Sequence, residues 1–427
     1  MKSSTIRVLL GLFFAAGMLF YVQRILIPYQ KQDAAAHDRP RGNLSDLYPR
    51  WLGARELLVN GRDPYSADIT REIQIGVYGR PLDPSRPGDP TDQQAFAYPV
   101  YVVFLLAPTI TLPFSIVQNA FFWFLLLVVL ASVPMWLVFL GWRPSAGTFV
   151  TLLLLTAGSY PVIQGLKLQQ LSVLVMGFIA LSCALISRDY FVPAGILMAF
   201  SLIKPQLAAP VAGWLVLWSW SDWTNRRRYM LSFGTTFLAL LAGSEWVLPG
   251  WIARFRDAVV AYRVYTGNIG SVLDSLLGPG VGRMAALLVV LGVLFFCWRA
   301  RKFSAAASQF SSVTCLVLTA TIVIVPSIAP YNQVLLLPAI LLLAWHVEKL
   351  VHASLPVRAV VIAAGILVAW QWISACALML LAVALPANQV QQWWTVPLFS
   401  SLLIPIAVLF GVWNSIRRES VPAPSLP

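Results

Sequence analysis

The dominant pattern in this chain is a series of long apolar runs separated by short polar segments that contain arginine or lysine. A run of about 20 apolar residues is long enough to cross a membrane as a helix. The composition agrees, because 59% of the residues are hydrophobic and only 11% are charged, and the single core of a soluble domain has no use for so much apolar surface. The sequence therefore predicts an all-α polytopic membrane protein in which residues 1–427 form a single integral membrane domain.

The positive clusters between the apolar runs predict the orientation, because cytoplasmic loops of membrane proteins carry an excess of lysine and arginine. If every cluster is cytoplasmic, an even number of crossings must separate each from the next. This gives about twelve transmembrane helices, with both termini and a tail at 414–427 in the cytoplasm. The predicted spans are Val8–Leu26, Ile116–Leu140, Phe149–Ile163, Leu171–Ile186, Val192–Ile203, Leu207–Trp220, Met230–Leu248, Met284–Trp298, Ser312–Pro326, Val334–His346, Val357–Leu385 and Val396–Trp413.

One apolar run, Tyr98–Pro113, does not fit this alternation and contains three prolines. Counting it as a span would place Arg143 outside and invert every later loop. We therefore interpret it as a re-entrant or juxtamembrane helix that packs against protein. The extracytoplasmic side then holds a long first loop, residues 28–115, with amphipathic and re-entrant helices, and a second loop, residues 250–283.

The net charge of +13 could suggest a nucleic-acid partner, but its distribution argues against one. Basic and acidic residues cancel between Arg24 and Asp92, so the excess lies in the short clusters between apolar runs, where the positive-inside rule accounts for it. The four cysteines lie in or beside apolar runs without CxxC spacing, and the three histidines are scattered. They indicate buried small hydrophobes, with neither a disulfide nor a metal site, and no cofactor is expected.

Three features of the polar segments suggest chemistry. Asp46 precedes a segment in which Leu47, Trp51, Ala54 and Leu58 recur at helical spacing, which predicts an amphipathic helix along the membrane, with a stop at Asn60-Gly61 and a turn at Asp63-Pro64. From its position Asp46 could be the helix N-cap or a catalytic base, and the two roles are compatible.

Lys204 interrupts an apolar stretch and is followed at once by Pro205. An ionisable residue in such a segment is costly and often functional, although a lysine can also extend its long stem to the membrane surface. Arg254, Arg256 and Arg263 lie on the second outer loop. They could form a solvated helix with local ion pairs, or a cradle that binds phosphate.

The segment "DLYPRWLGARELLVNGRDPY", residues 46–65, resembles the opening motif of the bacterial membrane glycosyltransferases of family 87, which belong to the GT-C fold group. That motif is an aspartate, an aromatic residue and "A-R-x-L-L-x-G-x-D-P-Y". The resemblance continues with Phe96, Tyr98 and Pro99, and with Lys204-Pro205 for a "K-P" element. Val100 replaces a second proline. At the position of a "G-Q-x-N" element the chain has Gln169, Gln170, Leu171 and Ser172, so glycine and asparagine are replaced. "SIAPYNQ", residues 327–333, loosely matches a late Ser-Pro loop.

The resemblance implies a GT-C-like fold and an inverting transfer of a mannose- or arabinose-type sugar from a polyprenyl-phosphate donor to a lipid or glycan acceptor outside the membrane. Asp46 would be the general base, and the donor phosphate would be bound by Lys204, Arg254, Arg256 and Arg263. The substrate pocket would include Tyr48, Arg55, Asp63, Tyr98, Gln170, Tyr331 and Asn332. The expected location is the bacterial inner membrane, with membrane lipids and the two substrates as partners and the chain as a monomer. A non-enzymatic transporter of lipid-linked sugars is the alternative; it should carry polar residues through the bilayer midplane and often repeat symmetry, whereas the spans here are nearly free of midplane charge and show no internal repeat.

Overall fold

The computed structural model describes residues 2–40, 42, 44–83, 85–86, 88–90, 92–265, 270–326, 329–352 and 355–419, and these contain helices and connections but no strand. The all-α prediction is confirmed for this part of the chain. In order, the helices are α1 Lys2–Phe20, a π-helical segment Tyr21–Leu26, α2 Ile27–Ala36, α3 Tyr48–Asn60, α4 Ala67–Tyr78, α5 Val102–Leu106, α6 Phe114–Leu140, α7 Ala146–Ala157, α8 Tyr160–Lys167, α9 Leu171–Ile186, α10 Phe191–Ser201, α11 Pro205–Trp220, α12 Trp223–Val247, α13 Trp251–Tyr265, α14 Val272–Leu277, α15 Pro279–Ala300, α16 Ser308–Ile324, α17 Leu337–Trp345, α18 Val347–Val351, α19 Leu355–Ala384, α20 Ala387–Gln391 and α21 Leu403–Glu419. Short 3₁₀ turns are Ala107–Thr109, Pro330–Leu336 and Val396–Leu398.

Six helical stretches are long and apolar enough to cross a membrane, or seven if the bent pair α7 and α8 counts as one span. The predicted total of twelve is therefore not confirmed. The remaining predicted spans are helices, but short ones; α10, for example, has 11 residues, where a crossing needs about 20. The multi-pass membrane character holds, while the number of crossings and the side on which each loop lies stay predictions.

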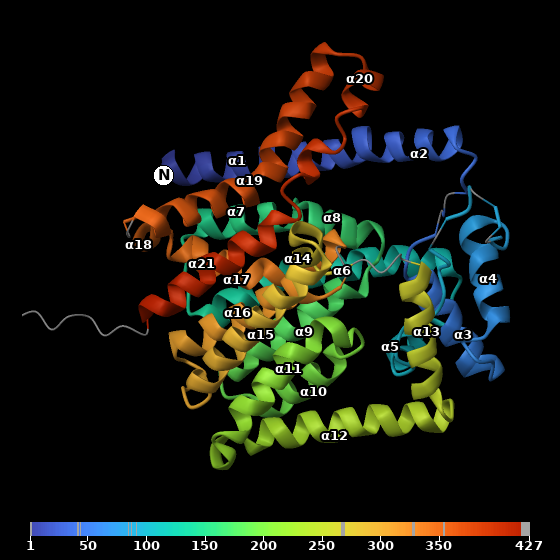
Figure 1. Ribbon diagram of the computed structural model, residues 1–427, viewed down its shortest axis with the longest axis horizontal. Helices are drawn as coiled ribbons and strands as arrows, with labels where there is room; N and C mark the ends of the chain where they lie inside the picture. The colour runs from blue at the N-terminus through green and yellow to red at the C-terminus, as the bar shows by residue number, and fades with distance from the viewer. Residues whose placement is uncertain are drawn as a thin grey trace, which may run out of the picture.

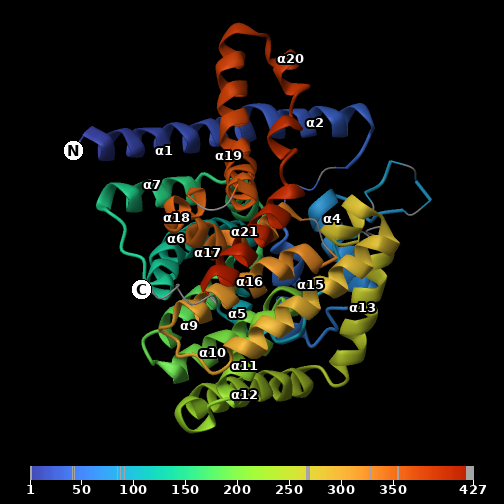
Figure 2. The ribbon, with the colours of Figure 1, turned by 60° about the vertical axis from the view of Figure 1, so that its left-hand side comes forward.

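The centre of the molecule is formed by α9 and α16, which are surrounded by protein. Almost every residue of α16 is buried, as are twelve of the sixteen residues of α9. α9 packs against α6 and α10, and α16 packs against α21, α15 and α11. In Figure 1 the rod of α1 and α2 runs along one side of this core, and α12 runs along the opposite side. Figure 2 shows α19 crossing the same rod, with which it packs.

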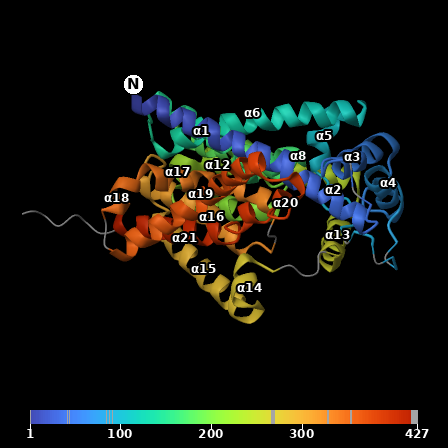
Figure 3. The same ribbon diagram turned by 90° about the horizontal axis from the view of Figure 1, so that it is seen from above.

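The first loop folds into compact structure at one end of the molecule. α3 and α4 lie there beside α13, as Figures 1 and 3 both show. α3 ends at Gly61, whose φ of 64° is the left-handed conformation that glycine adopts at low cost, so the predicted stop is confirmed. The apolar side of this helix packs against protein, and whether the helix lies along the membrane stays a prediction. Trp51, Leu52, Ala54 and Leu57 are all buried, because α3 packs against α5 and α4 inside the protein.

The proline-rich run at residues 98–113 forms only the five-residue helix α5, a 3₁₀ turn and connections. Val100, Val102, Val103 and Leu106 have no exposed surface. A helix of this length cannot cross a bilayer, so the prediction that the run packs against protein is confirmed. Whether it re-enters the membrane stays a prediction.

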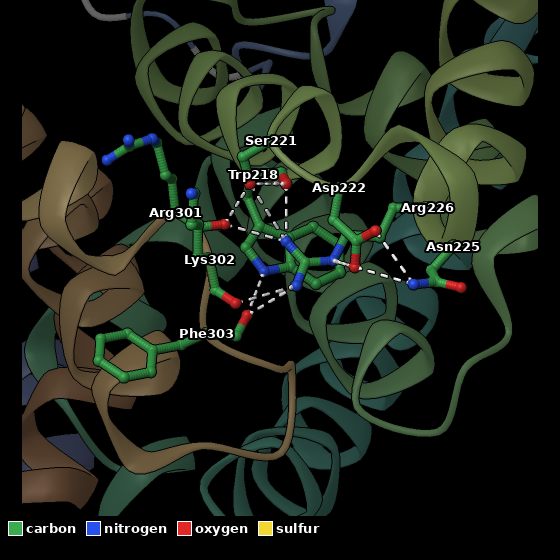
Figure 4. Close-up of polar contacts among 8 residues, drawn as sticks. All are labelled: Trp218, Ser221, Asp222, Asn225, Arg226, Arg301, Lys302 and Phe303. Carbon is green, nitrogen blue, oxygen red and sulfur yellow. Dashed lines mark hydrogen bonds and ion pairs between the residues drawn. The ribbon is translucent and has the colours of Figure 1, made fainter.

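One arginine of the "NRRR" cluster is a buried structural residue. Arg226, in the first turns of α12, donates to the carbonyl oxygens of Trp218, Arg301 and Phe303 at 2.8, 2.9 and 3.0 Å (Figure 4). Its guanidinium also lies over the Trp218 ring, 4.1 Å from the centroid. These bonds join α11, α12 and the connection after α15. Arg227 and Arg228 beside it are exposed.

Candidate active site

Asp46 lies in the connection just before α3, and its carboxylate faces the turn between α8 and α9. Its backbone N–H donates to the Leu168 carbonyl oxygen at 3.1 Å, which fixes the connection against that turn. One carboxylate oxygen accepts a hydrogen bond from the Gln170 side-chain amide. The N-cap residue of α3 is Leu47, and no side chain caps the helix. The helix-cap interpretation of Asp46 is therefore wrong, and the side chain, which stays partly exposed, is directed to another part of the fold.

The turn that presents Gln170 has an unusual backbone. Gln169 has a φ of 45°, a left-handed conformation that costs about 1 kcal/mol or more for a residue other than glycine. The Gln169 side-chain amide donates to the Leu166 carbonyl oxygen at 2.8 Å, and the Gln170 N–H donates to the Gly165 carbonyl oxygen at 2.8 Å. Glycine at this position of the family motif suits that conformation, and here glutamine adopts it.

Lys204 lies in the turn between α10 and α11, and its ammonium group is directed into the protein. Nζ donates to Gln170 Oε1 at 3.0 Å and to Ser172 Oγ at 2.6 Å. Ser172 in turn donates to Asn332 Oδ1 at 2.7 Å. Only 6% of Lys204 is exposed, so the interpretation of a lysine that extends to the membrane surface is wrong.

Two tyrosine rings enclose the Lys204 ammonium. The Tyr98 centroid lies 5.8 Å from Nζ and the Tyr331 centroid 5.1 Å, which are distances suited to cation–π attraction. Tyr98 is held by its carbonyl oxygen, which accepts from the Tyr65 hydroxyl at 2.5 Å. The neighbouring Tyr101 hydroxyl donates to the Leu202 carbonyl oxygen at 2.7 Å, and so ties this loop to the Lys204 turn.

Sequence reasoning missed Arg50 as a member of this cluster. It lies one turn after Asp46, and its Nη1 donates to the Asp46 carbonyl oxygen at 2.6 Å. Its guanidinium lies over the Tyr98 ring, 4.6 Å from the centroid. The spacing of four residues between Asp46 and Arg50 was the available signal, since such pairs share a helix face.

The surroundings shift the pKa of both Asp46 and Lys204. Burial raises the pKa of Asp46, and Asp92 adds to this, while Arg50, Lys204 and the bond from Gln170 act in the opposite direction. Burial also lowers the pKa of Lys204, as does Arg50, whereas Asp46 raises it. Desolvation is the largest cause in each case, because it penalises the charged form of any group. The pKa of each group is thus shifted towards neutral pH, and such shifts are typical of functional sites.

The other residues predicted for the site lie outside this cluster. Tyr48 packs its ring against Phe114, with centroids 4.9 Å apart, and Arg55 is exposed, with its guanidinium 5.6 Å from the centroid of the Trp51 ring. Asp63 accepts from the Tyr65 N–H at 2.9 Å, as predicted for a turn, and its other oxygen forms an ion pair with Arg254 at 2.9 Å.

Of the other two arginines predicted to bind phosphate on α13, Arg256 pairs with the adjacent Asp257 at 2.9 Å, and both side chains are mostly exposed. Arg263 lies on the same helix, α13, but its side chain is outside the described residues. Within the described part of the chain no group of three or more His, Cys, Asp or Glu side chains is arranged to hold a metal ion. All four cysteines are buried.

Comparison with known protein families gives one match. The model of glycosyltransferase family 87 matches residues 96–326, more than half of the chain. The chain belongs to glycosyltransferase family 87. The match includes Tyr98, Gln170 and Lys204, which the structure brings together, and it begins after Asp46. No curated protein and no solved structure gave a match.

Proposed function

We propose that this family 87 glycosyltransferase has a GT-C-like architecture and is an inverting enzyme with Asp46 as its general base. The sugar, of the mannose or arabinose type, would pass from a polyprenyl-phosphate donor to a lipid or glycan acceptor on the extracytoplasmic face of the bacterial inner membrane. The observation that supports this is the link from the Asp46 carboxylate through the Gln170 amide to the Lys204 ammonium. It joins a base and a phosphate-binding cation in one partly accessible polar cluster.

In the proposed reaction, an acceptor hydroxyl oxygen attacks the anomeric carbon from the face opposite the phosphate. The bond from that carbon to the phosphate oxygen breaks, and its electron pair leaves with the polyprenyl phosphate. The hydroxyl proton passes to the Asp46 carboxylate, which later returns it to water. Attack from the opposite face inverts the configuration. Asp46 suits this role because burial raises its pKa, which makes the carboxylate a stronger base than an aspartate in water.

A single carboxylate is sufficient for this reaction. Glycosidases need a second carboxyl group to protonate an alkoxide leaving group, whereas a phosphate leaves as a stable anion. What it needs is positive charge held in place before the reaction, which costs no reorganisation when the bond breaks. Lys204 meets this need in its protonated form, because its partners Gln170 and Ser172 are uncharged and an anionic phosphate beside the ammonium would favour that form.

The test is release of polyprenyl phosphate by the purified chain in nanodiscs, with a panel of polyprenyl-phosphate sugars and extracted envelope glycolipids. Wild type is expected to turn over one donor. Asp46→Asn, which keeps the shape of the side chain and an oxygen for Gln170, is expected to bind that donor while kcat falls on the order of 10³-fold. Turnover near the wild-type rate in Asp46→Asn would remove Asp46 from the role of base. No release from any donor by wild type would contradict the proposed reaction.

A further inference from the structure

The cluster around Asp46 contains more positive than negative charge at close range. Arg50 bonds to the Asp46 backbone, and Lys204 is joined to its carboxylate through Gln170. Asp92 also acts electrostatically on Asp46 and Arg50, but its carboxylate accepts hydrogen bonds from the Gln94 backbone and side chain. The hydrogen bonds around Asp46 therefore join two cations to one carboxylate, and Asp92 adds a second negative charge that acts on Asp46 and Arg50 electrostatically. A guanidinium and an ammonium held close to each other favour an anion whose oxygens can bind both of them.

Arg50 is the cation with unused hydrogen-bonding capacity. Its Nε is buried and has no hydrogen-bond partner among the described residues. An unpaired buried donor on a charged group carries a substantial free-energy cost. Tyr98, whose ring lies under the guanidinium, also lies against Lys204 Nζ, so one ring contacts both cations.

The outer-loop arginines are less suited to binding this anion. Arg254 is already paired with Asp63, and Arg256 is paired with Asp257 in solvent, where such charges gain little from binding an ion. Arg50 and Lys204 are packed in the protein and held by tyrosine rings and hydrogen bonds. Preorganised cations of this kind contribute most to binding charge in a low-dielectric site.

We propose that Arg50 is the second phosphate-binding residue of this enzyme, and that its Nε and Lys204 Nζ bind oxygens of the same phosphate group. The proposal rests on the proposed transfer from a polyprenyl-phosphate donor. The positive charge of Arg50 and Lys204 matches the negative charge of Asp46 and the phosphate both before and after sugar transfer. Before transfer they face the Asp46 carboxylate and a phosphodiester with one negative charge. After transfer Asp46 carries the acceptor proton, and the departing phosphate monoester carries two negative charges.

The experiment measures binding and does not require turnover. The full chain in nanodiscs is titrated with farnesyl phosphate, a short prenyl phosphate, and with farnesol, which has the same tail and no phosphate. The variants are Arg50→Gln and Arg50→Lys, and the matched control is Arg71→Gln, an exposed arginine on α4 whose side chain is 68% accessible. We expect Arg50→Gln to weaken farnesyl phosphate binding roughly 10- to 100-fold, the effect of losing a charged hydrogen bond. Farnesol binding should not change.

Arg50→Lys is expected to lose less, because lysine keeps the charge but not the planar group of donors. It also provides a readout if the glutamine variant does not fold. The proposal is overturned if both folded variants keep the wild-type ratio of farnesyl phosphate affinity to farnesol affinity. This includes the case in which the affinity for both compounds falls by the same factor, since Arg50 would then only support the fold. Failure of the proposed transfer is a separate result, seen as no release of polyprenyl phosphate while phosphate binding still depends on Arg50.

Discussion

Asp46 and Lys204 are held at the two ends of one amide group, the side chain of Gln170. Its nitrogen donates to the Asp46 carboxylate, and its oxygen accepts from the Lys204 ammonium at 3.0 Å. Opposite charges in direct contact would neutralise each other. An amide between them keeps the carboxylate available as a base and the ammonium available for an anion, and it fixes the orientation of both.

The pH profile of transfer should have an acidic limb set by Asp46. Burial and Asp92 raise its pKa, against Arg50, Lys204 and Gln170, so the carboxylate is protonated and inactive at higher pH than an ordinary aspartate of pKa about 3.9. We expect kcat to fall with decreasing pH through a pKa above that value. Gln170→Leu removes a hydrogen bond that lowers this pKa, so its acidic limb should move to higher pH. Initial rates at saturating donor, measured across pH for both proteins, test this, and a limb near pH 4 in wild type would contradict it.

Loss of the Lys204 charge should impair use of the donor. In Lys204→Met the apolar stem remains and the ammonium is removed, so the leaving phosphate loses electrostatic stabilisation. We expect kcat/KM for the donor to fall on the order of 10²-fold, with partial recovery in Lys204→Arg. Steady-state kinetics with varied donor provide the measurement. A methionine variant with unchanged kcat/KM would show that the buried lysine serves the fold alone.

The ion pair between Arg254 and Asp63 should attach α13 to the first loop. Both side chains are partly exposed, at 42% and 31%, so we expect a coupling free energy of only about 0.2–1 kcal/mol. Thermal unfolding of Arg254→Gln, Asp63→Asn and the double variant gives this coupling directly. If Arg254 binds phosphate instead, as the sequence suggested, its loss would weaken farnesyl phosphate binding as strongly as the loss of Arg50.

Arg226→Leu should destabilise the protein strongly, because it leaves the carbonyl oxygens of Trp218, Arg301 and Phe303 without this donor. We expect a loss on the order of 3 kcal/mol and a lower thermal midpoint in nanodiscs. The matched control is Arg227→Leu, since the adjacent Arg227 is exposed and should change stability little. Equal thermal midpoints for the two variants would show that the Arg226 hydrogen bonds do not stabilise the fold.

Part of the candidate site could be predicted from the sequence because the signal was local. Lys204 stood out because a charged residue is rare in an apolar stretch, and Asp46 because it precedes an amphipathic segment; the family motifs at residues 46–65 and at Lys204-Pro205 indicated their chemistry. The partners of these residues could not be predicted. No local pattern indicated that Arg254 would pair with Asp63, or that α3 would pack its apolar side against α4 and α5.

By itself the sequence determined the class of protein, because hydrophobic runs and charge clusters act through local helix formation and transfer into lipid. It determined the stop of α3 at Gly61 and the turn at Asp63 for the same reason. Only the tertiary structure decided that Gln170 connects Asp46 to Lys204 and that Arg50 lies over the Tyr98 ring. These contacts bring together four segments far apart in the chain, and packing of α3, α9 and α11 sets their distances. Residue spacing along a chain contains no information about such distances until the helices are placed.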